Sequence, residues 1–341
     1  MFFVFLKKER IMIWRKKFDR SGLNILPLKL RQNKMTAADV KPLDFVSGFQ
    51  DPELDNLAAK VAAAAKNGRE VIAMMGSHAM RRGCARFFID LMERRCITHL
   101  ASNASLAIHD FEMAYLGATL EDVEVYIYDG KFGNWEEGRA INEAVKRGVK
   151  DNIGFGRSIG RMIENEEFGK MPYKDMSLFA AAFRLGIPAT VHKGIGLDIT
   201  DQHPSADYAA LGKASGDDFL LFAESISKFE GGVFLNFGSQ IFGPEVYLKA
   251  LSMARNVAKQ ENREIRNFTT GVFDVMDLGN WREKGIVDYR RSETLSDPRY
   301  YFRPLKSILI RTIKDGGESY YIKGDFGETI PAFYSKVVKA L

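Results

Sequence analysis

The sequence predicts an α/β protein: a Rossmann-like, doubly wound and mostly parallel sheet with helices on both faces. Short apolar segments without polar alternation, such as Val71–Gly76 and Gly232–Phe237, are typical of strands buried on both faces. These segments alternate with helical ones through short connections, as in successive strand–helix units. The 341 residues, 46% of them hydrophobic, allow a large core and exclude a disordered or disulfide-stapled chain.

The elements follow one another from residue 51. Asp51 is expected to cap the first helix, which runs through 57–65 and stops at Asn67–Gly68. The expected strands are 71–76, 97–101, 123–128, 189–192, 232–237, 266–275 and 319–323. The expected helices are 81–95, 105–116, 174–185, 217–229, 244–257, 298–314 and 328–341. The stretch 130–175 is polar, Gly-rich and mostly helical or irregular.

Positive charge is concentrated at the start of the chain. Residues 1–34 hold ten Lys/Arg and two acids, whereas 35–341 carry a net charge of −3. We interpret 1–34 as a basic N-terminal extension that is either disordered or not translated, with translation beginning at Met35. Residues 35–341 are expected to form a single domain. Because the body is mildly acidic, nucleic acid is not an expected partner.

Targeting signals and metal-binding cysteines are not recognisable. The apolar opening MFFVFL is too short for a signal peptide, and no later run approaches the roughly 20 apolar residues of a membrane span. Cys84 and Cys96 lack metal-ligand spacing and are interpreted as buried, reduced thiols. These features predict a cytoplasmic protein without a membrane partner.

In a doubly wound sheet, ligands bind beyond the carboxyl ends of the strands. The first such end, Gly76–Gly83, combines a turn glycine with a helix start that suits an anion, although an ordinary turn with solvated arginines explains it equally well. The second end carries Asn103, Ser105 and the pair His109–Asp110. His109 is suited to orienting an amine or exchanging a proton, and Ser105 with an acid is also a common helix cap.

Three later strand ends carry further polar residues. The loop 192–204 contains Asp198, Asp201 and His203; a metal is not favoured because no short ligand spacing is present, and a solvated loop is an alternative. Glycines 238 and 243 flank a loop before a helix that begins near Glu245, an arrangement suited to phosphate. Asp325, between the last strand and helix, suits a ribose hydroxyl or an ammonium, or a helix cap.

These segments, taken in order, resemble deoxyhypusine synthase, and more closely the bacterial deoxyhypusine synthase-like branch. The resemblance covers about 50–341 and is carried by VIAMMGSHAMRRG, ITHLASNASLAIHDFE, RLGIPATVHKGIGLDITDQHPS, GGVFLNFGS and YYIKGDFGETIP. It implies a Rossmann-like homotetramer that binds NAD. It also implies transfer of the aminobutyl group of spermidine, or of another polyamine, to a protein lysine or a small diamine such as putrescine.

The resemblance also assigns roles to individual residues. The resemblance makes Lys306 the imine-forming lysine, and His109, on its own chemistry at the second strand end, is the other residue expected to be catalytic. Cofactor contacts fall to Ser77, His78, Ala79, Arg81, Asn103, Ala104, Ser105, Thr270, Gly271 and Asp325. Substrate contacts fall to Asp198, Asp201, His203 and Glu245. No metal is implied.

The chain departs from that family's pattern at several positions. Ile108–His109 replace two adjacent acids, Val272–Phe273–Asp274 replace a Gly-Ser-Asp-Ser-Gly run, and a Trp-Gly-Lys motif is missing. An exposed helix lysine is therefore an alternative interpretation of Lys306. Two alternative functions remain: a related NAD enzyme acting on an agmatine-type amine, and a catalytically silent homologue that binds NAD or polyamine.

Overall fold

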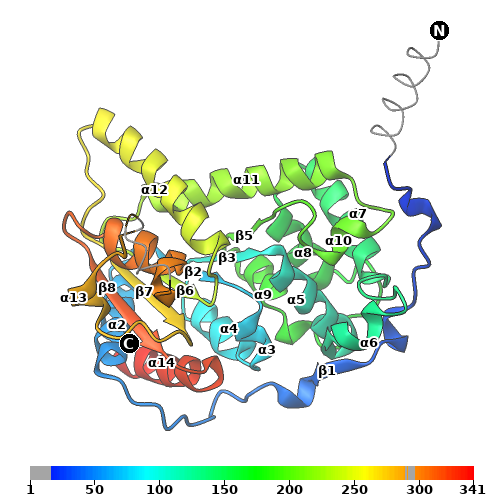
Figure 1. Ribbon diagram of the computed structural model, residues 1–341, viewed down its shortest axis with the longest axis horizontal. Coiled ribbons are helices and arrows are strands. Elements are labelled where there is room, and N and C mark those ends of the chain that lie inside the picture. The colour runs from blue at the N-terminus through cyan, green and yellow to red at the C-terminus, as the bar shows by residue number, and fades with distance from the viewer. Residues whose placement is uncertain (1–16, 289, 291–295) are drawn as a thin grey trace.

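A six-stranded parallel sheet forms the centre of the computed structural model, which describes residues 17–288, 290 and 296–341 (Figure 1). Its strands are β2 (Val71–Met75), β3 (His99–Asn103), β5 (Ala189–His192), β6 (Val233–Phe237), β7 (Thr269–Asp274) and β8 (Glu318–Lys323). They lie in the order β5-β3-β2-β6-β7-β8, all in parallel pairs. The chain winds outward from β2 to one side and then from β6 to the other. This order confirms the predicted doubly wound α/β fold.

Side chains of β2 show why its sequence is apolar without alternation. Val71, Ala73 and Met75 belong to the core on one face of the sheet, and Ile72 and Met74 belong to the core on the other. All five are fully buried. A strand covered on both faces has no solvent side on which polar residues are favoured.

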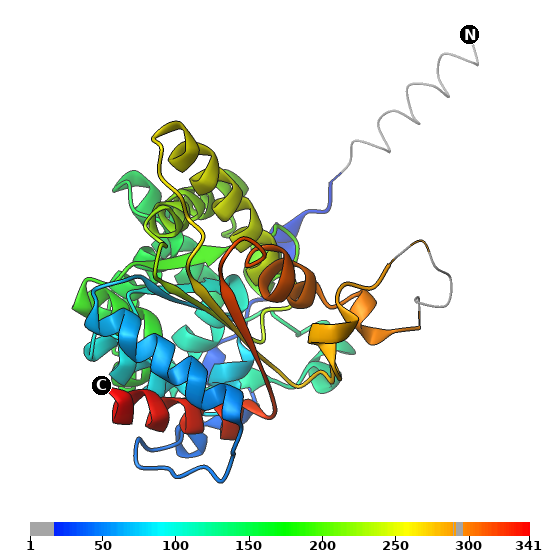
Figure 2. The ribbon, with the colours of Figure 1, turned by 90° about the vertical axis from the view of Figure 1, so that its left-hand side faces the viewer.

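Two layers of helices supply that cover. One layer contains α2 (Pro52–Lys66), α4 (Ala85–Glu93) and α14 (Phe326–Ala340); the other contains α11 (Tyr208–Ser227), α12 (Phe242–Gln260) and the π-helix η7 (Leu305–Arg311). Figure 2 shows α2 and α14 lying together on one side of the sheet. Further helices gather beyond the β5 edge: α5 (Ala104–Leu116), α7 (Glu137–Lys150), α8 (Phe155–Glu164), α9 (Leu178–Leu185) and α10 (Ile199–Gln202).

The N-terminal strap, residues 17–36, crosses this helical part. It was expected to lie outside the body, but it ends in β1 (Asn33–Thr36), which pairs antiparallel with β4 (Ala118–Glu121). Arg20 donates to the main-chain oxygens of Asp201 and His203 at 2.9 and 3.1 Å. Leu28 is fully buried against Tyr126 and Trp135. These contacts hold the strap against the helical part of the protein along its length.

Two expected elements differ most from the observed ones. The expected strand 123–128 is instead the short helix α6 (Val123–Ile127), whose Val123, Val125 and Ile127 are about half exposed; β4 precedes it. The expected helix 298–314 is split into a 3₁₀ turn, Pro298–Tyr300, and η7. The break lies at Tyr301–Phe302, and helical backbone resumes at Arg303; Pro304, with a φ of −57°, suits the first turn of the new helix.

No helix among the described residues combines the length and the hydropathy needed to cross a lipid bilayer. Cys84 and Cys96 are both buried and free of disulfides, as expected.

Candidate functional site

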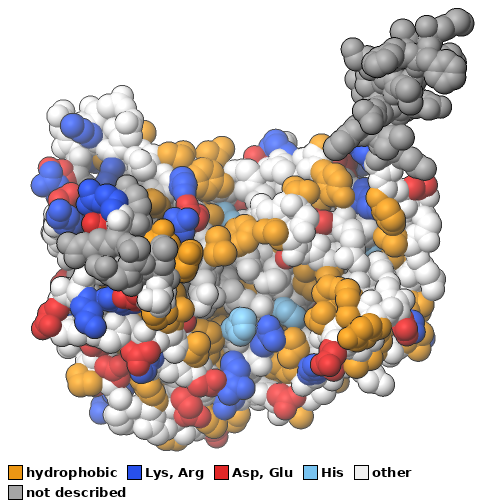
Figure 3. Space-filling view, in the orientation of Figure 1, with side chains coloured by type: hydrophobic (Ala, Val, Ile, Leu, Met, Phe, Trp, Pro, Cys, Tyr) orange, Lys and Arg blue, Asp and Glu red, His pale blue; other side chains and the backbone are white. Residues whose placement is uncertain are grey.

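A cavity of about 490 Å³ lies beyond the carboxyl ends of β2, β3 and β5. Arg81 comes from α3 (His78–Arg81) after β2, Ser105 and His109 come from α5 after β3, and Asp198 comes from the loop after β5. The N-terminal strap contributes Arg31 to the same cavity. Figure 3 shows histidine and basic side chains next to one another near the middle of this face. The cavity is therefore built where a doubly wound fold places its ligands.

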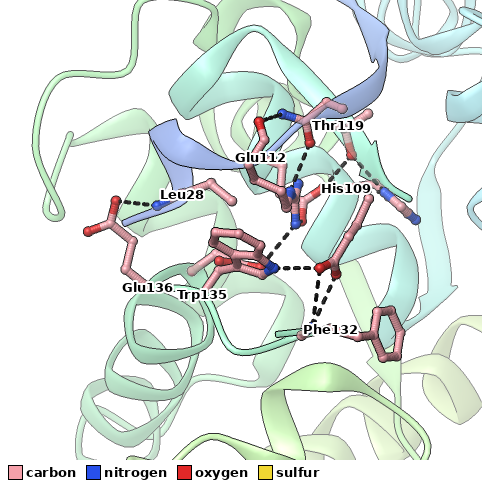
Figure 4. A network of polar contacts seen from close by, with 12 residues as sticks. Leu28, His109, Glu112, Thr119, Phe132, Trp135 and Glu136 are labelled. Atoms are coloured by element: carbon pink, nitrogen blue, oxygen red, sulfur yellow. Dashed lines mark hydrogen bonds and ion pairs between the residues drawn. The ribbon is translucent and has the colours of Figure 1, made fainter. Parts of the chain in front are cut away.

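A chain of hydrogen bonds leads from the cavity into the core (Figure 4). His109 Nδ1 lies 2.7 Å from Thr119 Oγ1, and the Thr119 hydroxyl donates to Glu112 Oε2. His109 and Glu112 are three residues apart on α5, so their side chains share one face of the helix. His109 is partly exposed, whereas Thr119 and Glu112 are buried. The arrangement holds the imidazole by one nitrogen at the cavity wall.

Behind this chain lies a buried ion-pair cluster. Arg31 Nη1 contacts Glu112 Oε1 at 2.7 Å and Glu137 Oε1 at 3.2 Å, and none of the three side chains is more than 2% exposed. Burial disfavours the Glu112 carboxylate, but the charge of Arg31 and the neighbouring His109 side chain outweigh burial and lower the pKa of Glu112 to about 2. Burial and the Glu112 charge raise the pKa of Glu137 well above its usual value. Arg31 thus stabilises the charged form of Glu112, whereas the surroundings of Glu137 favour its neutral form.

Glu121 faces the cavity without an ion-pair partner among the described residues. Its carboxyl accepts from the neutral donors Trp135 Nε1, at 2.5 Å, and Gly133 N, at 3.1 Å. Burial raises the pKa of Glu121. A cation brought next to this carboxyl by a ligand would favour its charged form.

The loop after β5 supplies a lysine that pairs with both of its carboxylates. Lys193 Nζ lies 2.9 Å from both Asp198 Oδ2 and Asp201 Oδ1, and the Lys193 side chain is fully buried. Asp201 Oδ2 also accepts from Gly196 N at 2.8 Å. Neither aspartate is therefore a free carboxylate for a polycation.

Lys34, Asp122 and Glu124 also line the cavity, and its apolar lining residues come from four different segments. They are Ile108, Leu120, Val123, Phe132, Leu197 and Ile199. A ligand that combines a hydrocarbon body with charged ends matches this lining.

The centre of the sheet lies next to the cavity. Because β2 and β6 are neighbours although the chain winds in opposite directions from them, their carboxyl ends mark the switch point. A Cβ on Gly76 would lie 3.1 Å from the main-chain oxygen of Gly238, and Gly238 has a φ of +63°. Glycines at both ends let the two loops approach each other closely.

His78 and Arg81 lie between the switch point and the cavity. Burial and the charges of Arg81 and His109 lower the pKa of His78, with an opposing effect from Asp274 at the end of β7. His78 is exposed and Arg81 is half-buried. At the start of α5, the Asn103 side chain accepts from the Ser105 hydroxyl at 2.8 Å and caps no main-chain amide.

The structure brings together part of the predicted set. Ser77, His78, Ala79, Arg81, Asn103, Ala104, Ser105, His109 and Asp198 lie at the strand ends around the cavity. Asp201 adjoins them through Lys193. Buried His203 bonds Ser205 at 2.8 Å and does not line the cavity.

The other predicted residues lie elsewhere. Thr270 and Gly271 were expected at a strand end but sit in the buried first half of β7, where Thr270 Oγ1 donates to Ile308 O at 3.2 Å. Asp325 caps α14 and pairs with Arg82 at 2.9 Å. Glu245 pairs with Lys249. Lys306 donates to Tyr300 O at 2.6 Å, and burial with Arg303 and Arg311 lowers its pKa.

Sequence reasoning missed Arg31, Thr119 and Glu121 as site residues. Glu112 carried a usable signal, since His109 and Glu112 have helical i,i+3 spacing. The sequence has no comparable signal for Arg31, because Arg31 lies in a basic stretch and pairs with a residue 81 positions away. Within the described part of the chain, no group of three or more His, Cys, Asp or Glu side chains is placed to hold a metal ion.

Comparisons with known proteins give neither a matching family model nor a matching curated protein. Among solved structures, a conserved putative LOR/SDH protein from Methanococcus maripaludis S2 is 13% identical, with a TM-score of 0.49 over 88% of this chain and 74% of that one. ArgZ, an arginine dihydrolase of the ornithine-ammonia cycle in cyanobacteria, is 13% identical with a TM-score of 0.49. AgrE in a ternary complex with ornithine and NAD+ is 13% identical with a TM-score of 0.47.

The alignments with ArgZ and AgrE include 86% and 87% of this chain. They include only 33% of ArgZ and 34% of AgrE. At this level of similarity, the likeness assigns no site or activity to this chain.

The expected membership of the deoxyhypusine synthase family is wrong. No family model matches, and the similar structures are described as an LOR/SDH protein and arginine dihydrolases. The expected aminobutyl transfer from spermidine is wrong with it. The site agrees with this correction, because Lys306 lines no part of the cavity and Asp198 and Asp201 both pair with Lys193.

Proposed function

We propose that the protein is an NAD-dependent enzyme that acts on a small amine of the agmatine type. The observation that carries the proposal is the His109–Thr119–Glu112–Arg31 chain, which opens into a cavity next to the switch point of a doubly wound sheet. One site would then combine His109 as a proton acceptor with Glu121 as a carboxyl for a cation. The switch point beside it would hold a dinucleotide.

The crevice has a donor set that fits a dinucleotide. The half-buried guanidinium of Arg81, the Ser105 hydroxyl and the uncapped amides at the start of α5 suit phosphate oxygens. Asn103, at the end of β3, stands where dinucleotide-binding folds place a ribose-binding residue. When bound, the nicotinamide would supply hydride acceptance.

The amine would be held by Glu121. This carboxyl faces the cavity without an ion pair, so a substrate ammonium would give it the charged partner that the protein does not supply. The apolar walls, including Leu120 and Val123, would contact the methylene groups of the substrate.

His109 would remove a proton from the substrate amine. Thr119 and Glu112 hold its Nδ1 side, which leaves Nε2 as the nitrogen available to a ligand. Positioned histidines of this kind typically contribute about 10²–10⁴-fold to a rate.

Purified protein with NAD and single amines tests the proposal through the absorbance of NADH. The panel holds agmatine, linear diamines, and the arginine and ornithine of the AgrE complexes. We expect turnover with at least one amine. His109→Gln should lower kcat at least about 100-fold, and Glu121→Gln should raise KM about 10-fold because a charged contact is lost.

Thr98→Val is a control outside the proposed site, because Thr98 bonds Glu70 and precedes β3 at its amino end. It should leave both constants unchanged. Absence of NADH with every amine, together with absence of NAD binding, would refute the proposal.

A further inference from the structure

We infer that Arg31, supplied by the N-terminal strap, is a positioning residue that determines which nitrogen of His109 carries the proton. The role of that nitrogen in proton removal rests on the proposed function, whereas the position of the proton is a property of the protein alone.

Arg31 is the cation of the buried cluster. Its side chain is fully buried, and its Nη1 contacts Glu112 at 2.7 Å and Glu137 at 3.2 Å. Its Nε donates to Asn33 Oδ1 at 2.8 Å, so the strap itself orients the guanidinium. Lys34, the next cation of the strap that lines the cavity, is half exposed and pairs with Asp122 instead.

The charge of Arg31 decides the state of Glu112. Without a cation, a carboxyl that is buried as completely as Glu112 favours its neutral form. With Arg31 in contact, Glu112 is a carboxylate and can only accept hydrogen bonds. The Thr119 hydroxyl must therefore donate its single proton to Glu112.

The direction of the Thr119–Glu112 hydrogen bond determines the direction of the hydrogen bond between Thr119 and His109. Since the Thr119 proton is used toward Glu112, Thr119 Oγ1 can only accept from His109, and His109 Nδ1 at 2.7 Å must be the donor. The neutral imidazole then has its proton on Nδ1 and a lone pair on Nε2. The side chains that face His109 from α3 are His78 and Arg81.

Loss of Arg31 removes this arrangement by either of two routes. If Glu112 takes up a proton, it donates to Thr119, Thr119 donates to His109 Nδ1, and the ring proton moves to Nε2. If Glu112 stays ionised, its uncompensated charge draws a second proton onto His109. Both routes protonate Nε2.

Nitrogen-15 NMR of the full chain with labelled histidine measures this directly. The chain has five histidines, so the spectrum is small, and His109→Gln assigns the signals of His109. At neutral pH, we expect wild-type His109 to show a protonated Nδ1 and an unprotonated Nε2. Arg31→Met should lose the unprotonated Nε2 signal, and Arg31→Lys, which keeps the charge, should retain it.

Lys34→Met is the matched control, because it removes a cation from the same strap and cavity rim and should leave the His109 signals in place. A protonated Nε2 in the wild type, an unchanged spectrum in Arg31→Met, or loss of the signal in Arg31→Lys as well as Arg31→Met would overturn the inference. The wild-type spectrum is itself a test, so a variant that fails to fold leaves the inference open to refutation. Neither result depends on a substrate, which separates this test from that of the proposed function.

Discussion

At the scale of single residues, Asp218 shows how a buried carboxyl makes stability depend on pH. Asp218 Oδ2 accepts from Gly156 N at 2.9 Å and Val191 N at 2.7 Å, joining α8 to β5. The side chain is almost fully buried, and burial raises the pKa of Asp218 from 3.8 to about 7. The folded protein therefore binds this proton more tightly than the unfolded chain does. The resulting stabilisation is complete below pH 3.8 and is lost as the pH rises through about 7.

Asp218→Asn should remove this dependence, because an amide cannot titrate. The unfolding free energy of the wild type, measured relative to Asp218→Asn by urea denaturation, should fall by about 1.4 kcal/mol per pH unit between pH 4 and 7. Asp217→Asn is the control, since Asp217 is solvent-accessible and paired with Lys213. A constant difference between the wild type and Asp218→Asn across this range would contradict the prediction.

At the scale of elements, the contact between α8 and α9 depends on Gly160. A Cβ at this position would overlap the main-chain oxygen of Phe179 and lie 2.9 Å from Cβ of Phe183. Gly160→Ala should therefore lower the unfolding free energy by about 1–3 kcal/mol through overpacking. Gly212 on α11 has open space around it, and Gly212→Ala should raise the unfolding free energy by about 0.5–1 kcal/mol through helix propensity. Urea midpoints that shift in the same direction for both variants would be inconsistent with this account.

The N-terminal strap is the element whose loss should cost most. A chain that begins at Met35 lacks both Arg31 and the fully buried Leu28. Removing one partner of a buried ion pair typically costs about 3–5 kcal/mol, because the other charge stays buried without compensation. We expect a loss of at least about 3 kcal/mol in urea unfolding relative to the full chain.

Lys34→Met serves as the control for the truncation and should change the unfolding free energy by less than about 1 kcal/mol, because its pair with Asp122 is exposed. A truncated chain as stable as the full chain would mean that the strap is not part of the folded unit.

Local pattern predicted the elements better than it predicted the site. The strand 71–76 could be identified because burial on both faces leaves a continuous apolar run, and 189–192 because a glycine and a proline precede it. The segment 123–128 has the alternation of a strand, yet it forms a solvent-facing helix. Lys306 and Thr270 were placed by resemblance and lie away from the cavity.

The part of the site that the sequence could not reveal is made of long-range contacts. Arg31 reaches Glu112 across 81 positions and Glu137 across 106. No local spacing records such a pair, and the pair exists only because the strap crosses the helical part of the molecule.

At the scale of the whole molecule, strand order decides where a ligand can bind. The chain runs outward from β2 through β3 to β5, and the next strand, β6, returns to the other side of β2. The helices that follow β2 and β6 consequently lie on opposite faces, and the loops at Gly76 and Gly238 meet at the switch point, where a doubly wound fold places its ligand crevice. The cavity with His109 lies beyond the carboxyl ends of β2, β3 and β5, next to this switch point, so the two parts of the proposed site would share one edge of the sheet.

A dinucleotide that binds in this crevice should stabilise the folded protein by mass action. NAD at 100 times its Kd should raise the unfolding free energy by about 2.7 kcal/mol, which thermal unfolding detects as a higher Tm.

Arg81→Gln should weaken NAD binding about 10-fold or more, because a half-buried charged donor is lost, and should reduce the increase in Tm at the same NAD concentration. Arg86→Gln, an exposed position on α4, should leave that increase unchanged. An increase in Tm that is equal in the wild type and Arg81→Gln would place the dinucleotide elsewhere, and no increase at any concentration would remove the dinucleotide from the site.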